Sequence, residues 1–138
     1  MKITTWQKAA KYDLILSSPC GTYVGPIDRG VNYFVLMLQQ QGANTHYSCE
    51  GHPSNFYIVF ESDTALARQI KTLGYFNVEV ESKERWSLRR EFNTEEEKQY
   101  VFTLAAKAWN KAFGALEARV SRANNTICKL ETNAAYVR

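Results

Sequence analysis

The feature that most constrains the fold is a long amphipathic stretch in the C-terminal third of the chain. Thr94 and Glu97 have the spacing of a capping box, and three consecutive glutamates complement the positive end of a helix that starts there. Apolar residues then recur with a 3.6-residue period as far as Val120. At roughly 1.5 Å per residue, a helix over 94–122 is about 43 Å long, whereas a compact domain of this size is about 26 Å across. The pattern therefore predicts one long C-terminal helix that either projects past the domain or breaks at Gly114.

The second half of this helix leads to a prediction about self-association. It presents three apolar residues where a domain of this size has no sheet left to cover: Phe113, Leu116 and Val120. Contiguous exposed apolar strips are unusual on monomers and often mark a contact surface. We therefore expect these residues to meet a second copy of the chain in a twofold homodimer, the commonest oligomer. The alternative is a bend at Gly114 that folds the helix back over its own domain.

The remaining patterns predict an α+β fold. One helix is expected to begin at Asp28 and end at Gly42, and another to begin at Ser62 or Asp63 and end at Gly74. Five strands are expected, the last as a hairpin partner at a sheet edge: 14–17, 45–49, 56–60, 75–81 and 86–92. This order suits a two-layer sandwich, with a mostly antiparallel sheet of four to five strands, two shorter helices and the long C-terminal helix.

Length and composition set the remaining limits. The chain of 138 residues has the length of a single domain over 1–138, and 45% hydrophobic with 22% charged residues is an ordinary globular profile. Residues 123–138 are expected to be a loose tail, or to add a short strand at 127–130. No apolar run approaches the roughly 20 residues of a membrane span, and the N-terminus lacks the pattern of a secretory signal. The odd number of widely spaced cysteines favours free thiols in a reducing cytoplasm.

Chemistry-bearing side chains concentrate in segment 45–53, Thr-His-Tyr-Ser-Cys-Glu-Gly-His-Pro, at the end of a predicted strand and in the loop after it. Such positions commonly carry sites. The interpretation we favour is structural, divided between plain scaffold and a non-catalytic ligand pocket. The pocket would be formed by His46, Ser48, Cys49, Glu50 and His52.

Two chemical interpretations of the same segment stay open. As an enzyme, the chain would use Cys49 as the nucleophile and His52 or His46 as its base, with Glu50 orienting the imidazole. As a metal site, His46, Cys49 and His52 fall short of four ligands and lack a paired Cys motif. His46 and Cys49 would also point to opposite faces of a strand. We therefore expect no metal and no cofactor.

A second candidate is the basic segment 83–90. Arg85, Trp86, Arg89 and Arg90 interleave cations with an indole, a combination that can grip phosphates and stack bases in a nucleic-acid or partner contact. The alternative is an edge strand that charge protects against self-association. Neighbouring glutamates dilute the patch, and the net charge of the chain is only +3.

A resemblance gives these residues a setting. Asp28-Arg29-Gly30-Val31, then Gly42, then Ser48–Pro53 and 56–60 resemble a block in small phage- and plasmid-encoded proteins. That block has a helix near Asp-x-Gly-Val, a glycine, a strand, Ser-Cys-x-Gly-His and a second strand. Ser48-Cys49-x-Gly51 also resembles the Ser-Cys-Ser-Gly segment of tRNA wybutosine-pathway methyltransferases, with Glu50 in place of the second serine. The first resemblance implies a mobile-element setting and no catalytic role.

Three functional hypotheses follow. The first is a non-catalytic binding protein of a phage or other mobile element, acting in the bacterial cytoplasm. It would occupy a host protein or protein–nucleic-acid complex, such as a host defence system. The second is a small Cys/His enzyme that acts on a nucleotide or RNA, and the third is a nucleic-acid-binding accessory protein.

Overall fold

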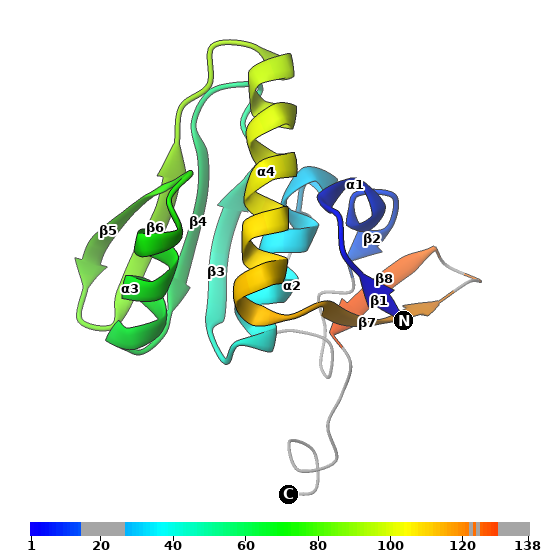
Figure 1. The fold of residues 1–138 in the computed structure, drawn as a ribbon, viewed down its shortest axis with the longest axis horizontal. Coiled ribbons are helices and arrows are strands. Elements are labelled where there is room, and N and C mark those ends of the chain that lie inside the picture. Colours follow the sequence, from blue (N-terminus) through cyan, green and yellow to red (C-terminus); the bar gives the residue numbers. More distant parts are fainter. Residues whose placement is uncertain (15–26, 122, 124, 130–138) are drawn as a thin grey trace, which may run out of the picture.

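The structure is a computed structural model that describes residues 1–14, 27–121, 123 and 125–129. It contains helices and two four-stranded sheets, which confirms the predicted α+β class (Figure 1). The main sheet has the order β3-β4-β6-β5 and is antiparallel throughout. Its strands are β3 (Asn44–Cys49), β4 (Phe56–Glu61), β6 (Arg85–Arg90) and β5 (Asn77–Ser82).

The second sheet has the order β1-β7-β8-β2, and the sequence patterns did not predict it. Its strands are β1 (Lys2–Ile3), β7 (Leu116–Ser121), β8 (Thr126–Lys129) and β2 (Asp13–Leu14), of which only β2 and β8 run parallel. The short helix α1 (Trp6–Ala9) follows β1. The strand expected at 127–130 is thus present as β8, and most of the strand expected at 14–17 lies outside the described residues.

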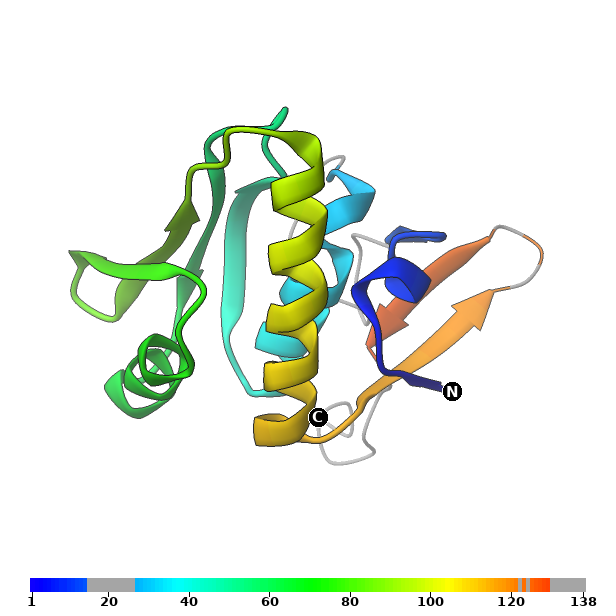
Figure 2. The ribbon, with the colours of Figure 1, turned by 45° about the horizontal axis from the view of Figure 1, so that its top comes forward.

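Helix α2 (Asn32–Gln40) lies between the two sheets, directly after the 3₁₀ turn η1 (Arg29–Val31) (Figures 1 and 2). It contacts β3 on one side and β7 and β8 on the other. Every residue from Asn32 to Gln39 is buried, because both sides of the helix are covered. A helix that is apolar nearly all round belongs in such a position.

The core is aromatic and joins the main sheet to the helices. Phe56 on β4 and Phe34 on α2 both pack edge-on or tilted against Phe102 of helix α4 (Glu95–Phe113). Trp109, also on α4, is fully buried against Phe34. Helix α3 (Thr64–Leu73) packs beside β5 and begins at Asp63, whose carboxylate caps the amide of Leu66 at 2.9 Å.

The long C-terminal helix begins as predicted and ends earlier. Thr94 caps α4 by accepting the amide hydrogen of Glu97, and the helix has 19 residues, about 28 Å, before it stops at Phe113. Gly114 takes a φ of +85°, and the chain then forms β7 in place of further helix. Leu116 and Val120 are four residues apart, which fits a strand as well as a helix, but Leu116 and Ala118 are both fully buried with a period of two.

Because α4 ends at Phe113, the projecting helix on which the predicted homodimer depended is not formed. Leu116 is buried inside its own chain, and Phe113 and Val120 pack against the same core. No projecting apolar strip is formed by these three residues. Self-association itself is a separate matter and stays a prediction.

Candidate functional site

Three segments that are distant in the sequence meet at one end of the main sheet, the upper end in Figure 1. Asp28 stands directly before η1, and Cys49 is the last residue of β3. The loop 50–55 then connects β3 to β4, and Lys98 reaches the loop from α4. The motifs around Asp28 and Cys49 therefore belong to a single place in the fold.

A reciprocal pair of hydrogen bonds joins the first two segments. Asp28 Oδ2 accepts the backbone N–H of Glu50 at 3.0 Å, and Glu50 Oε1 accepts the backbone N–H of Gly30 at 3.3 Å. A Cβ on residue 30 would stand only 2.5 Å from the Glu50 carboxyl carbon, so any other residue there would force the Glu50 carboxylate to move. Gly51 has a φ of +85°, and a Cβ on it would stand 2.5 Å from the carbonyl oxygen of Pro53.

Lys98 on α4 adds further hydrogen bonds to this loop. Its residue is 1% exposed, and its Nζ donates to Glu50 Oε2 at 2.8 Å, to Gly51 O at 3.0 Å and to Glu95 Oε2 at 2.9 Å. Burial alone would lower the pKa of Lys98, but the two carboxylates outweigh it and raise the pKa above its usual value. The hydrogen bond from Lys98 in turn lowers the pKa of Glu95. We call Gly30, Glu50, Gly51, Glu95 and Lys98 the support frame.

The support frame holds three side chains of different chemistry close together. One carboxylate oxygen of Asp28, the sulfur of Cys49 and one ring nitrogen of His52 all lie within 4.8 Å of one another. His52 Nε2 is 3.7 Å from Asp28 Oδ2. Cys49 is half-buried and is a free thiol, whereas the His52 side chain is 73% exposed. Asp28, Cys49 and His52 therefore form a cluster that is open to solvent on the His52 side, and we call this cluster the candidate centre.

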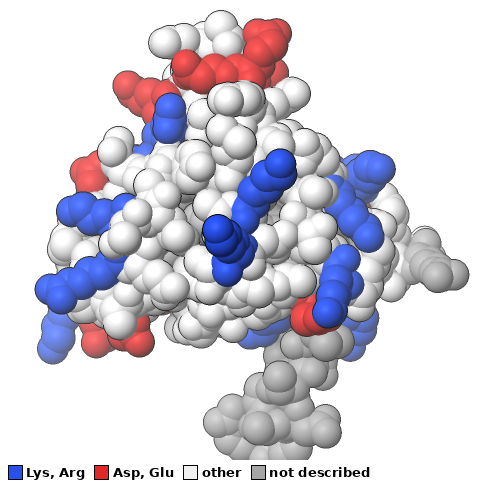
Figure 3. All heavy atoms as spheres, viewed as in Figure 1, with Lys and Arg blue, Asp and Glu red and all other residues white. Residues whose placement is uncertain are grey.

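The surroundings of this centre are acidic. The first turn of α4 carries Glu95, Glu96 and Glu97, and acidic side chains gather at that end of the molecule in Figure 3. His52 is near enough to Glu95 to contribute to the lowering of its pKa. Such a field attracts cations to the centre and repels phosphate groups.

The structure divides the predicted pocket residues into two groups. Cys49, Glu50 and His52 come together as described, but Glu50 belongs to the frame and does not orient the imidazole. Ser48 pairs with Ile58 on the core-facing side of the sheet, and its buried hydroxyl has no hydrogen-bond partner among the described residues. His46 lies at the opposite end of the hairpin.

His46 belongs to a surface cluster of three side chains on three neighbouring strands. Its Nε2 is 2.6 Å from Glu61 Oε1, and Arg85 Nη2 donates to the same oxygen at 3.2 Å. All three side chains are between 29% and 42% exposed. We call His46, Glu61 and Arg85 the surface cluster.

Sequence reasoning missed Asp28, Gly30 and Lys98 as site residues. Asp28 was expected to be a helix N-cap, but its side chain makes no capping bond and binds the amide of Glu50. The resemblance already grouped Asp28 and Gly30 with Ser48–Pro53, and this grouping was the available signal. For Lys98, the signal was its place on the buried stripe of α4, one turn before Val101 and Phe102.

The basic segment does not form the predicted edge strand. β6 lies between β4 and β5, so the edges of the main sheet are β3 and β5. Arg85 and Arg89 alternate with Trp86 and Arg90, and the two pairs therefore point to opposite faces of the sheet. The four side chains cannot form one continuous patch.

Each arginine of this segment has local partners. Arg85 pairs with Glu61, and Arg89 donates to Ser87 Oγ at 3.1 Å while its guanidinium lies over the ring of Tyr57. Arg90 donates to the carbonyl oxygen of Tyr75 at 2.7 Å. Contact with nucleic acid stays a prediction for these residues.

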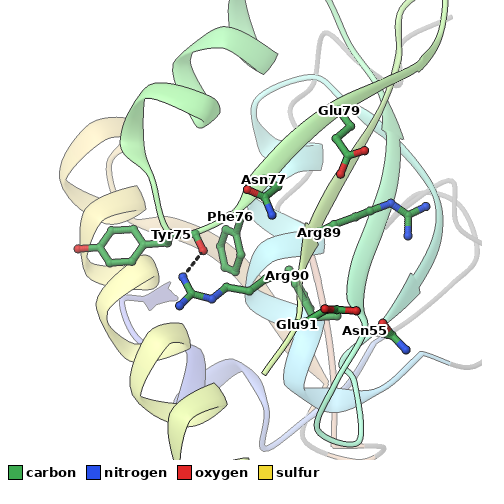
Figure 4. A pocket seen from close by; sticks show the side chains of 9 residues that line it. Asn55, Tyr75, Phe76, Asn77, Glu79, Arg89, Arg90 and Glu91 are labelled. Carbon is green, nitrogen blue, oxygen red and sulfur yellow. Dashed lines mark hydrogen bonds between the residues drawn. The ribbon is translucent and has the colours of Figure 1, made fainter. Parts of the chain in front are cut away.

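A cavity of about 620 Å³ lies where β5 and β6 meet the loop 50–55 (Figure 4). Arg89 and Arg90 line it together with Glu79 and Glu91, so its charges balance. Arg90 points across it to the backbone of Tyr75. The balanced lining gives this cavity no preference for an anion or a cation.

The cysteines differ from the sequence-based expectation. Cys128 on β8 is disulfide-bonded, so the prediction of free thiols is wrong for this residue; Cys20 lies outside the described residues. The argument from free thiols to a reducing compartment therefore does not hold, and a cytoplasmic location stays a prediction. No helix in the described part of the chain has both the length and the apolarity needed to cross a membrane.

Comparisons with known proteins find no family model, no curated protein and no solved structure that matches this chain. The geometry of the centre is thus the basis for a functional assignment.

Proposed function

We propose that the protein is a small enzyme whose reacting groups are Asp28, Cys49 and His52, the second of the three sequence-based hypotheses. The observation that carries the proposal is the convergence of a thiol, an imidazole and a carboxylate within 4.8 Å at a solvent-open surface. These are the side chains that enzymes use as nucleophiles, bases, orienting groups and metal ligands. The proposal replaces Glu50 with Asp28 as the carboxylate beside the imidazole.

The support frame favours a site over plain scaffold. A buried ammonium group is costly unless each of its protons is bound, and here Lys98 has three acceptors. A loop of six residues could be closed without such a charge. The frame holds the two residues between Cys49 and His52, as positioning of reacting groups requires.

The glutamates at the start of α4 limit the kinds of substrate that the centre can bind. Glutamates at the start of α4 repel phosphates, so we expect a neutral or cationic group to occupy the centre. A nucleotide or RNA would have to enter with its base toward Cys49 and its phosphates away from α4. The reaction we expect is displacement at an electrophilic carbon. The thiol, or a water that the centre activates, passes its proton to His52 and bonds to the carbon, and the bond to the leaving group breaks as that group takes up a proton.

The first hypothesis, a mobile-element protein that occupies a host macromolecule, rests on the resemblance of Asp28–Val31 and Ser48–Pro53. The two hypotheses differ in what they require of Cys49. A packing role predicts that Cys49→Ser keeps function, whereas a reacting role predicts that function is lost with folding preserved.

The test compares variants in bacterial extract. Small molecules and RNA nucleosides are measured by mass spectrometry after incubation with the parent, Cys49→Ser, His52→Ala, Asp28→Asn and His46→Ala. The parent and His46→Ala should convert the same species, and the three centre variants should not, at unchanged melting temperatures. Conversion that persists in all three centre variants, or a parent that converts nothing, would overturn the proposal.

A further inference from the structure

We infer that the candidate centre is a zinc site, in which Asp28, Cys49 and His52 are the protein ligands and a fourth position faces solvent. Its catalytic meaning rests on the proposed function, but the binding of the ion does not. The metal site considered from the sequence used His46, which the fold places at the other end of the hairpin. Asp28, which lies directly before η1, replaces His46 as the third ligand.

The three ligand atoms lie close enough together to bind one ion. A single nitrogen of His52 lies within 4.8 Å of both the sulfur of Cys49 and a carboxylate oxygen of Asp28. In a nucleophile–base–carboxylate relay, the imidazole uses one nitrogen for the nucleophile and the other for the carboxylate. Convergence of sulfur, nitrogen and oxygen on a common point is the arrangement of a metal site.

The spacing of the ligand atoms is also close to that of tetrahedral zinc. Tetrahedral zinc with ligand bonds of about 2.0–2.3 Å has its ligand atoms about 3.3–3.7 Å apart. His52 Nε2 and Asp28 Oδ2 are 3.7 Å apart, and the widest separation in the centre is no more than 4.8 Å. His52 is the most exposed of the three, so its side chain can rotate toward the other two ligands without disturbing the core.

The donor atoms and the charges around them favour zinc over other cations. A thiolate, an imidazole and a carboxylate together suit zinc, whereas calcium and magnesium prefer oxygen alone. Two anionic ligands balance the charge of the ion, and the proton of Cys49 leaves to solvent when the metal binds. The glutamates at the start of α4 add a field that favours a cation.

Hydrogen bonds from residues behind the centre hold the Asp28 ligand in place. Ligand side chains in metal sites are held by hydrogen bonds to second groups. Here Asp28 accepts the amide of Glu50, and Glu50 is itself fixed by Gly30 and Lys98. A site with three protein ligands that opens to solvent is typical of catalytic zinc. Zinc in such a site acidifies a bound water and so supplies a nucleophile.

The test measures metal binding by metal-free protein. Zinc is titrated in competition with a chromophoric chelator, and cobalt is added separately to detect the charge-transfer absorption of a cobalt–thiolate bond. We expect one equivalent of zinc per parent chain and a cobalt–thiolate band that is absent in Cys49→Ser. Asp28→Asn and His52→Ala should each weaken zinc binding about a hundredfold or more, and His46→Ala, the matched histidine control, should bind like the parent.

The outcomes separate this inference from the proposed enzyme. Absence of zinc binding by the folded parent, an unchanged affinity in Cys49→Ser, or an equal loss in His46→Ala would overturn the zinc site. Full conversion of substrate in the presence of a chelator would leave the enzyme standing and remove zinc from it. Stoichiometric zinc binding without any conversion would keep the zinc site and remove the enzyme.

Discussion

The two ends of the β3–β4 hairpin carry similar side chains and differ in what lies beneath them. The surface cluster joins His46, Glu61 and Arg85 across adjacent strands, all three partly exposed to water. The candidate centre also has a histidine beside a carboxylate, but the cation that holds its loop is buried, with the side chain of Lys98 only 2% exposed. Residue types alone therefore do not distinguish the two ends of the hairpin. The buried cation beneath the loop does.

The largest expected effect comes from removing the buried cation. Lys98→Met leaves Glu50 and the carbonyl of Gly51 without their shared donor, and breaking a buried ion pair costs about 3–5 kcal/mol. Arg85→Met, the matched change in the surface cluster, should cost no more than about 1 kcal/mol. Urea unfolding of both variants measures the difference. Equal costs would show that the frame is no more important to stability than the surface cluster.

A smaller effect should come from filling the space at Gly30. In Gly30→Ala the new Cβ stands 2.5 Å from the Glu50 carboxyl carbon, and overpacking of this kind costs about 1–3 kcal/mol. Glu50→Ala removes the obstructing group but also a partner of Lys98. The double variant should therefore lose less stability than the sum of the two single variants. Simple additivity in urea unfolding would contradict the proposed contact.

Much of the fold was accessible to sequence reasoning because local signals were strong. The caps at Asp63 and Thr94 are formed as predicted, and the stop at Gly74 follows the expected helix closely. The sequence did not predict the second sheet because β1 and β2 have two residues each, too few for a periodic pattern. The sequence did not predict β7 because the spacing of Leu116 and Val120 also fits a helix. Only the burial of Ala118 distinguishes the strand from a helix.

Only part of the candidate site could be predicted from the sequence. Cys49 and His52 are close in the sequence, so their proximity was predictable, whereas Asp28 comes from another segment and acts through the amide of Glu50. Lys98 was recognisable only as a lysine on an apolar stripe. Long-range partners of this kind depend on how η1 and α4 meet the loop, and no local pattern contains that information.

The free energy of unfolding at acidic pH tests the role of Glu95 in the support frame. The pKa of Glu95 is lowered below its ordinary 4.5 by the hydrogen bond from Lys98. The stabilisation is thus present above pH 4.5 and is lost as the pH falls through the lower, folded-state value. Glu95→Gln should therefore lose less stability than the parent on acidification. Because Glu95 is half-exposed, we expect the difference to stay below about 1 kcal/mol. Identical acid profiles in urea unfolding would contradict the role of Glu95 in the frame.

The smallest effect concerns His46. Its removal leaves Arg85 at 3.2 Å from Glu61 and buries no charge, so His46→Ala should change stability by no more than about 0.5 kcal/mol. Its effect should appear on Glu61, whose pKa is lowered first by the hydrogen bond from Arg85 and second by that from His46. NMR titration of Glu61 in His46→Ala should show a pKa that rises toward its usual value and remains lowered, because Arg85 stays in place. A Glu61 pKa that does not move would mean that His46 makes no contact with it in solution, and the surface cluster would then reduce to one ion pair.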